Sequence, residues 1–254
     1  MSNQTSVIAL NKFWLRPWLA AAVLCGSLVS IGLVWATSRG GGIGLDFAVF
    51  WRAARTTNVY SPNPFDPFVY PPTTLLWLKP LCWLSFWPAF ILWSLVSLVA
   101  YMAAARKWLL LGSPVVIQCL VFGQTSMILA AGILVAARSE GVVMGVILGL
   151  VFSLKPQLLV TAPLVLLLRR QWRSLSGFLI GAVVSVAFSV ILFGPHVWLE
   201  WAGSIPAFRR VLESRDLWWV MITPYSVGMR LGVSPWPFLL MGCCVAHFAQ
   251  KAIR

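Results

Sequence analysis

The sequence predicts an all-α protein, a polytopic transmembrane helical bundle with about 7–9 membrane segments, some of them half-length. Hydrophobic residues make up 60% of the 254 residues and charged residues only 10%, whereas roughly a quarter of a soluble domain is charged. Five stretches of about twenty residues or more carry no formal charge, which is long enough to cross a bilayer. They are residues 17–38, 80–105, 108–137, 174–199 and 231–250. Backbone groups in lipid need internal partners, which favours helices, and a barrel would show short alternating segments instead.

Composition also narrows the possible function. The 19 Lys and Arg residues exceed the 6 acids, and the net charge of +13 would suggest nucleic-acid binding in a soluble protein. Here the basic residues lie between apolar runs, so we expect membrane lipids as partners and no nucleic acid. The five cysteines lie in apolar runs without His or acids at metal-ligand spacing, so no metal site and no cofactor is predicted.

The chain is predicted to form a single integral membrane domain over residues 1–254. Its first span, about 17–36, follows Lys12 and Arg16 and is expected to be an uncleaved signal anchor. The later segments 73–105, 109–137 and 141–168 are each interrupted by polar or proline residues. The interruptions are Lys79-Pro80 with Trp87-Pro88, Gly123-Gln124, and Lys155-Pro156. They predict half-length helices of the kind that line cavities in membrane proteins, and further helices are expected at 177–194 and 236–250.

The orientation in the membrane follows from the basic cluster Arg169, Arg170 and Arg173, which the positive-inside rule puts in the cytoplasm. The polar loops 37–72 and 195–235 are then expected on the outer side of the inner cell membrane. This arrangement requires 141–168 to enter and leave the membrane as a hairpin of two short helices, which is the interpretation we favour. A single tilted span there would reverse the orientation of everything downstream.

The first outer loop, 37–72, contains a predicted interfacial helix. Its apolar residues recur at the i, i+3, i+4 and i+7 spacing of one helix face. These residues are Phe47, Phe50, Trp51 and Ala54. Arg52 and Arg55 fall on another face, three residues apart. Asp46 falls at the helix start, where it is either a capping residue of the first turn or a functional carboxylate.

Three further residues, uncharged or basic, are candidates for binding. Lys155 lies in apolar sequence, where a charge costs at least about 2.5–3.5 kcal/mol, so it either contacts a ligand or snorkels to the interface from a hairpin turn. Gln124 is a weaker candidate, because a glutamine in a broken helix can simply bridge helices. Tyr70 ends a stiff proline-rich stretch and can hold a hydroxyl near a sugar or phosphate, although such tyrosines more often only lie at the interface.

Several short motifs follow one another in a fixed order. They are Asp-Phe-x-x-Phe-Trp-x-Ala-Ala from Asp46, Tyr60-x-Pro, Tyr70-Pro-Pro, Gly123-Gln124, Lys155-Pro156 and Arg169-Arg170-Gln171-Trp172-Arg173. Over most of residues 40–180 this order resembles glycosyltransferase family 87, the polyprenol-phosphate-mannose-dependent membrane mannosyltransferases. The resemblance implies a GT-C fold whose first outer loop carries the catalytic acid, and Asp46 matches that carboxylate by position.

The resemblance further implies a membrane enzyme that transfers a sugar, with mannose expected, from a polyprenyl-phosphate donor to a glycolipid or envelope-glycan acceptor on the outer face. One carboxylate is enough for a single inverting displacement, and Asp46 is the best base, with Asp66 the only other acid of that loop. The departing lipid phosphate needs cations or amide donors. The candidates for contacting it are Arg52, Arg55, Tyr70, Gln124 and Lys155.

Two alternatives stay open. A multi-span transporter or lipid flippase also fits broken helices and an intramembrane lysine. The resemblance implies more C-terminal helices than this sequence holds, so the C-terminus is expected to be short for the family. A catalytically silent membrane subunit is therefore the other alternative.

Overall fold

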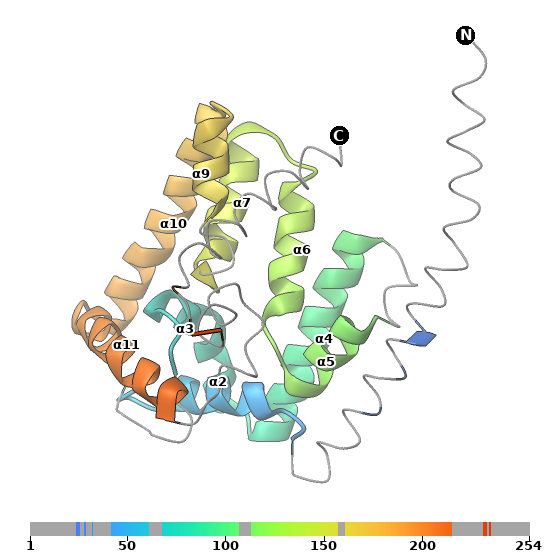
Figure 1. Cartoon of the computed structure of the whole chain (residues 1–254), viewed down its shortest axis with the longest axis vertical. Coiled ribbons are helices and arrows are strands. Elements are labelled where there is room, and N and C mark those ends of the chain that lie inside the picture. The colour runs from blue at the N-terminus through green and yellow to red at the C-terminus, as the bar shows by residue number, and fades with distance from the viewer. Residues whose placement is uncertain are drawn as a thin grey trace. The chain divides into compact units, whose positions relative to one another are not determined.

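The structure is a computed structural model that describes residues 42–60, 68–106, 113–156 and 161–214, with residues 24, 25, 28, 32, 231, 232 and 234. All elements in these ranges are helices, which confirms the predicted all-α class for the described residues (Figure 1). The chain divides into two compact units, residues 1–52 with 81–134 and residues 53–80 with 135–254. The expected segments 17–36 and 236–250 lie outside the described residues, apart from four helical residues between 24 and 32. The single domain over 1–254 stays a prediction.

The first unit shows the interrupted helices that the sequence predicts. It holds most of α2 (Leu45–Arg55) and α6 (Ser126–Ala136), together with α4 (Phe86–Ala105) and α5 (Pro114–Phe122). A 3-10 turn, η1 (Lys79–Trp83), precedes α4, and Pro88 falls in the first turn of α4, where the missing N–H costs nothing. Gly123 is left-handed, with φ 71° and ψ 40°, and separates α5 from α6. The 109–137 segment is therefore a broken helix.

Aromatic packing fixes the start of α2 in this unit. Phe47 is fully buried, and its ring centre lies 5.8 Å from that of Phe86 and 5.6 Å from that of Phe90. Phe50 and Ala54 are buried as well, and Arg52 and Arg55 are exposed. The predicted division of this helix into an apolar and a basic face is confirmed.

The second unit is built from α3 (Pro72–Leu78), α7 (Gly141–Phe152), α9 (Thr161–Leu168), α10 (Trp172–Phe193) and α11 (His196–Ser214). Pro72 opens α3 at its first turn, as its fixed φ predicts. The segment 195–235, expected as a polar loop, contains α11 over its first half. The indole N–H of Trp198 donates to Ser189 Oγ at 3.0 Å, which attaches α11 to α10.

Helices α7 and α10 pack against each other in parallel through four glycines. A Cβ on Gly145 would overlap the carbonyl oxygen of Ser174, and a Cβ on Gly149 would overlap that of Phe178. Reciprocally, Gly177 meets the carbonyl of Val142, and Gly181 meets that of Val146. The residue numbers at the contacts increase in the same direction along both helices, so the two helices are parallel. Each helix contributes a Gly-x-x-x-Gly pair, which lets membrane helices approach to backbone contact.

The direction of α9 resolves the alternatives for 141–168. A three-residue turn, 169–171, joins α9 to α10, with Arg170 in the left-handed region at φ 54°, so α9 runs opposite to α10. Since α7 is parallel to α10, α9 also runs opposite to α7, as the ribbon in Figure 1 shows. The segment is a hairpin of two short helices, and a single tilted span is excluded.

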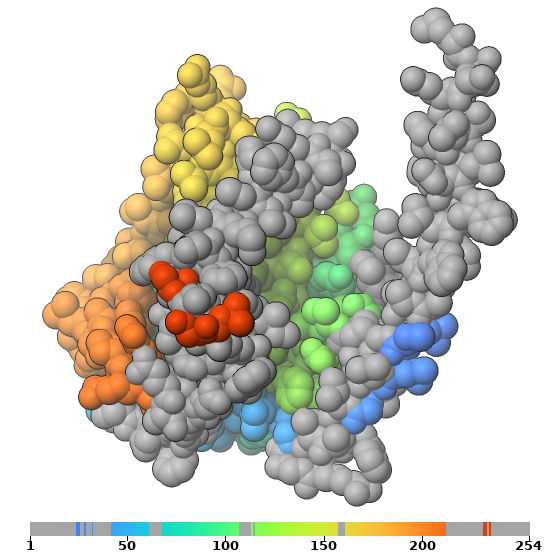
Figure 2. Space-filling model, viewed as in Figure 1, coloured from blue at the N-terminus to red at the C-terminus, as the bar shows by residue number. Residues whose placement is uncertain are grey.

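Two of the described helices, α4 and α10, are long and apolar enough to cross a membrane. Most residues of each are not buried, unlike those of a core helix in a soluble protein. On α10 the exposed apolar side chains include Ile180, Val183, Phe188, Ile191 and Leu192. Figure 2 shows part of this helix uncovered on its unit's surface. A count of 7–9 membrane segments and a GT-C bundle stay predictions.

Candidate functional site

Asp46 is the second residue of α2 and lies in its first turn, half-buried. Gly44 leads into the helix with φ +71°, and its N–H donates to the carbonyl of Val121 at 2.7 Å. A Cβ at Gly44 would lie 2.9 Å from the ring of Phe86, so only glycine fits this approach. The entry to α2 is thus attached to the end of α5, and this attachment fixes the position of the carboxylate.

Gln124 lies in the break between α5 and α6 and faces Asp46. Its side-chain Nε2 donates to Asp46 Oδ2 at 2.8 Å, a hydrogen bond to a charged group between residues 78 apart in sequence. Its backbone N–H donates to the carbonyl of Cys119 at 3.0 Å, and the Cys119 Sγ lies 3.8 Å from Gln124 Oε1. The structure therefore brings together two of the residues that the sequence singled out.

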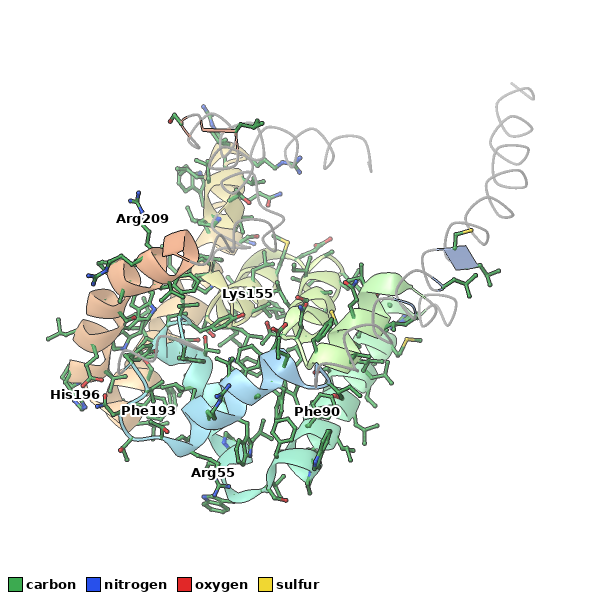
Figure 3. All side chains as sticks on the ribbon, turned by 60° about the horizontal axis from the view of Figure 1, so that its bottom comes forward. Arg55, Phe90, Lys155, Phe193, His196 and Arg209 are labelled. Atoms are coloured by element: carbon green, nitrogen blue, oxygen red, sulfur yellow. The ribbon has the colours of Figure 1, made fainter. Side chains whose placement is uncertain are left out.

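Arg52 and Arg55 lie elsewhere on α2. At 3.6 residues per turn they are displaced about 120° and about 180° from Asp46 around the helix axis. Both side chains are exposed, and Arg52 Nε donates to the Ala48 carbonyl of its own helix at 3.1 Å. Arg55 is labelled in Figure 3. These guanidinium groups are not gathered around the Asp46 carboxylate.

Lys155 and Tyr70 meet in the second unit. The Lys155 Nζ lies 5.9 Å from the centre of the Tyr70 ring, within the range of a cation–π contact (Figure 3 labels Lys155). Both residues are half-buried. The ring of Phe68 packs against Tyr70 at 5.6 Å, and the Tyr60 hydroxyl donates to the Tyr70 carbonyl at 2.7 Å. A cation is thus held over an aromatic ring whose own position is fixed from two sides.

Two threonines hold the backbone beside Lys155, and the sequence reasoning missed them. Thr73 Oγ1 donates to the carbonyl of Ser153 at 2.6 Å, and Thr74 Oγ1 donates to that of Leu154 at 3.1 Å. Both hydroxyls are buried in the first turn of α3. They satisfy carbonyls that the end of α7 leaves without helical partners. Consecutive threonines after Tyr70-Pro-Pro were the available signal, because hydroxyls in an apolar segment need acceptors.

Helix α11 anchors the loop that carries Tyr70. The indole N–H of Trp201 donates to the carbonyl of Val69 at 3.1 Å. Burial raises the pKa of the Tyr60 hydroxyl well above its usual value, and the Glu200 carboxylate raises this pKa further. Tyr60 therefore stays protonated at neutral pH and keeps donating to the Tyr70 carbonyl. Asp66, the other acid of the first loop, lies outside the described residues.

Among the residues that the structure describes, no group of three His, Cys, Asp or Glu side chains could hold a metal ion. The polar chemistry consists instead of a carboxylate with an amide in one unit and an ammonium over a phenol ring in the other. Such groups can exchange a proton with a hydroxyl and attract an anion, respectively.

Comparison with known proteins identifies a protein family. The family model of glycosyltransferase family 87 matches residues 68–250, a range that includes Tyr70, Gln124 and Lys155 and begins after Asp46. No curated protein and no solved structure matches the chain. Since the matched range covers more than half of the sequence, the chain belongs to glycosyltransferase family 87, which indicates a glycosyltransferase and, with two long apolar helices, a membrane protein.

Proposed function

We propose that the protein transfers a sugar, mannose by its resemblance to family 87, from a polyprenyl-phosphate donor to a glycolipid or envelope-glycan acceptor with inversion. The reaction takes place at the outer face of the inner membrane, in a multi-pass protein. Family membership supports the reaction class, and the hydrogen bond between Gln124 and Asp46 supports the choice of base.

Asp46 is the proposed general base. Its carboxylate takes the proton of the acceptor hydroxyl as that oxygen attacks the anomeric carbon of the donor. The bond between this carbon and the phosphate oxygen breaks, and the lipid phosphate leaves with the electron pair. The single observation that carries this assignment is an acceptor-only carboxylate, half-buried in a first helical turn and held by a neutral amide donor.

Lys155 is the proposed contact for the donor phosphate. A half-buried ammonium attracts an anion more strongly than an exposed one, because the local dielectric constant is lower. The Tyr70 ring orients the ammonium through a cation–π contact. Arg52 and Arg55 are exposed, so we propose them as weaker phosphate contacts that solvent screens.

The test is transfer of labelled mannose from polyprenyl-phosphate mannose in membranes that contain the protein, with the lipid and glycan products separated. Asp46→Asn is expected to lower the rate by about 10²–10⁴, the usual contribution of a general base. Glu140→Gln is the matched control, because Glu140 is an exposed acid just before α7. Wild-type transfer by Asp46→Asn would remove Asp46 from the mechanism.

The same membranes distinguish a transporter or flippase. Such a protein would move the labelled lipid between leaflets without changing it covalently. If the labelled lipid moves between leaflets and no labelled product forms in the presence of acceptor lipids, the protein is a transporter or flippase and not a transferase.

A further inference from the structure

We infer that Gln124 is a positioning residue that orients the Asp46 carboxylate for proton transfer. This inference rests on the proposed function, because it assumes that Asp46 is the base. It gives Gln124 a role different from the phosphate contact expected from the sequence, since the side-chain amide nitrogen donates to Asp46 Oδ2 at 2.8 Å.

The orientation of the amide follows from the chemistry of its two neighbours. A carboxylate can only accept, so the NH₂ end of the Gln124 side chain must face Asp46. The other end, Oε1, faces the Sγ of Cys119 at 3.8 Å, and a thiol is a weak donor. The amide therefore has one arrangement that satisfies both ends. It occupies Oδ2, so that Oδ1 is the oxygen that we assign to the proton of the acceptor hydroxyl.

The backbone beneath Gln124 is held as firmly as its side chain. The Gly123 carbonyl accepts the indole N–H of the buried Trp93 at 3.1 Å. A Cβ at Gly123 would lie 2.5 Å from the Cβ of Phe47, the residue next to Asp46. The break between α5 and α6 therefore lies in van der Waals contact with the first turn of α2. A glutamine that merely bridged two helices would not need this close approach beside the carboxylate.

The other groups around the pair come from three helices. The residues of α4 that pack on this turn are the uncharged Phe86, Phe90 and Trp93. On α5 the neighbouring titratable group is the Cys119 thiol, and on α2 itself Arg52 and Arg55 lie on other faces. The hydrogen bond from Gln124 is thus a close polar contact of the Asp46 carboxylate, and without it the carboxylate would lose a contact that fixes its orientation.

The experiment measures kcat and the donor KM for mannose transfer in membranes with wild type, Gln124→Leu and Gln124→Glu. Gln124→Leu removes the hydrogen-bond donor, and we expect kcat to fall about 10-fold or more, because misplaced groups lose rate, with donor KM within about 3-fold. Gln124→Glu replaces the amide with a carboxylate, which cannot donate to Asp46, and should lower kcat at least as much with a similar donor KM.

Folded protein in each membrane sample is quantified, so that a loss of protein is not read as a loss of rate. A kcat per folded protein that equals the wild-type value in both variants would overturn the inference, because a purely structural glutamine would lower yield and leave kcat unchanged. Asp46→Asn in the same assay separates the two proposals. Full activity there removes the base and this inference together, whereas its inactivity combined with an unchanged kcat of the Gln124 variants removes only the inference.

Discussion

The glycine contact between α7 and α10 predicts that a Gly→Ala substitution lowers stability inside the contact and raises it at an open helical position. In Gly149→Ala the new methyl group would overlap the carbonyl oxygen of Phe178 and lie 2.9 Å from the backbone nitrogen of Ala182. Both are backbone atoms that cannot turn away, so the helices must separate. Gly203 in α11 has no atom within 4 Å of its Cβ position, so Gly203→Ala is the matched control.

The magnitudes follow from two opposed terms. Alanine stabilises a helix relative to glycine by about 0.8–1 kcal/mol, and both variants receive this gain. Overpacking costs about 1–3 kcal/mol, and only Gly149→Ala carries that cost, or more if the helix interface is lost. We therefore expect Gly203→Ala to be stabilised by up to ~1 kcal/mol. Gly149→Ala should be destabilised by up to ~2 kcal/mol, a difference in Tm of several degrees at roughly 2–4 °C per kcal/mol.

The assay is thermal unfolding of the purified protein in detergent, followed by the fraction that remains monodisperse after heating. Purification in one detergent and at one protein concentration keeps the comparison between variants valid. A Gly149→Ala protein that melts at or above the temperature of Gly203→Ala would refute the close parallel packing of α7 and α10.

Two further predictions concern the sites. Tyr70→Phe keeps the ring under Lys155 and should leave the KM for the polyprenyl-phosphate donor within about 2-fold of wild type. Tyr70→Leu removes the ring and should raise this KM about 2- to 30-fold, which is the value of a cation–π contact. Equal KM values for the two variants would contradict the cation–π role. Gly123→Ala combines positive φ with a 2.5 Å approach to Phe47, and should lower stability in the same melting assay by about 2–5 kcal/mol. Gly141→Ala, also at positive φ but with nothing within 4 Å, should lose only the backbone part, about 1–2 kcal/mol, and an equal loss would argue against the Phe47 contact.

Local features of the fold could be predicted because their causes are local. The i, i+3, i+4, i+7 spacing identified α2, and Gly123-Gln124 and Lys155-Pro156 identified the breaks, since glycine and proline act within a turn of themselves. Helix α11 was missed, because Pro206 and its charged residues are typical of a loop. The helix forms nevertheless, with Trp198 and Trp201 hydrogen-bonded to distant partners.

The pairings within each site depend on contacts that no local pattern contains. Gln124 and Asp46 are 78 residues apart, and the Thr73 hydroxyl reaches a carbonyl 80 residues away. The sequence identified Asp46 and Gln124 as candidates without identifying them as partners, and it did not identify Thr73. The motif order was informative because it grouped such residues, and the structure then paired Asp46 with Gln124 and Tyr70 with Lys155.

Each broken apolar segment has backbone groups without helical partners, which are costly in lipid unless another part of the chain satisfies them. In the first unit, the Gly44 N–H donates a hydrogen bond to the carbonyl of Val121, two residues before Gly123. In the second unit, the hydroxyls of Thr73 and Thr74 donate hydrogen bonds to the two backbone carbonyls that precede Lys155.

The groups that satisfy both breaks come from the starts of α2 and α3, and each start also carries a candidate residue, Asp46 two residues after Gly44 and Tyr70 three before Thr73. The hydrogen bonds that satisfy a break therefore also fix the position of a side chain available for chemistry. This coupling explains why the polar interruptions of the apolar helices coincide with the candidate functional residues.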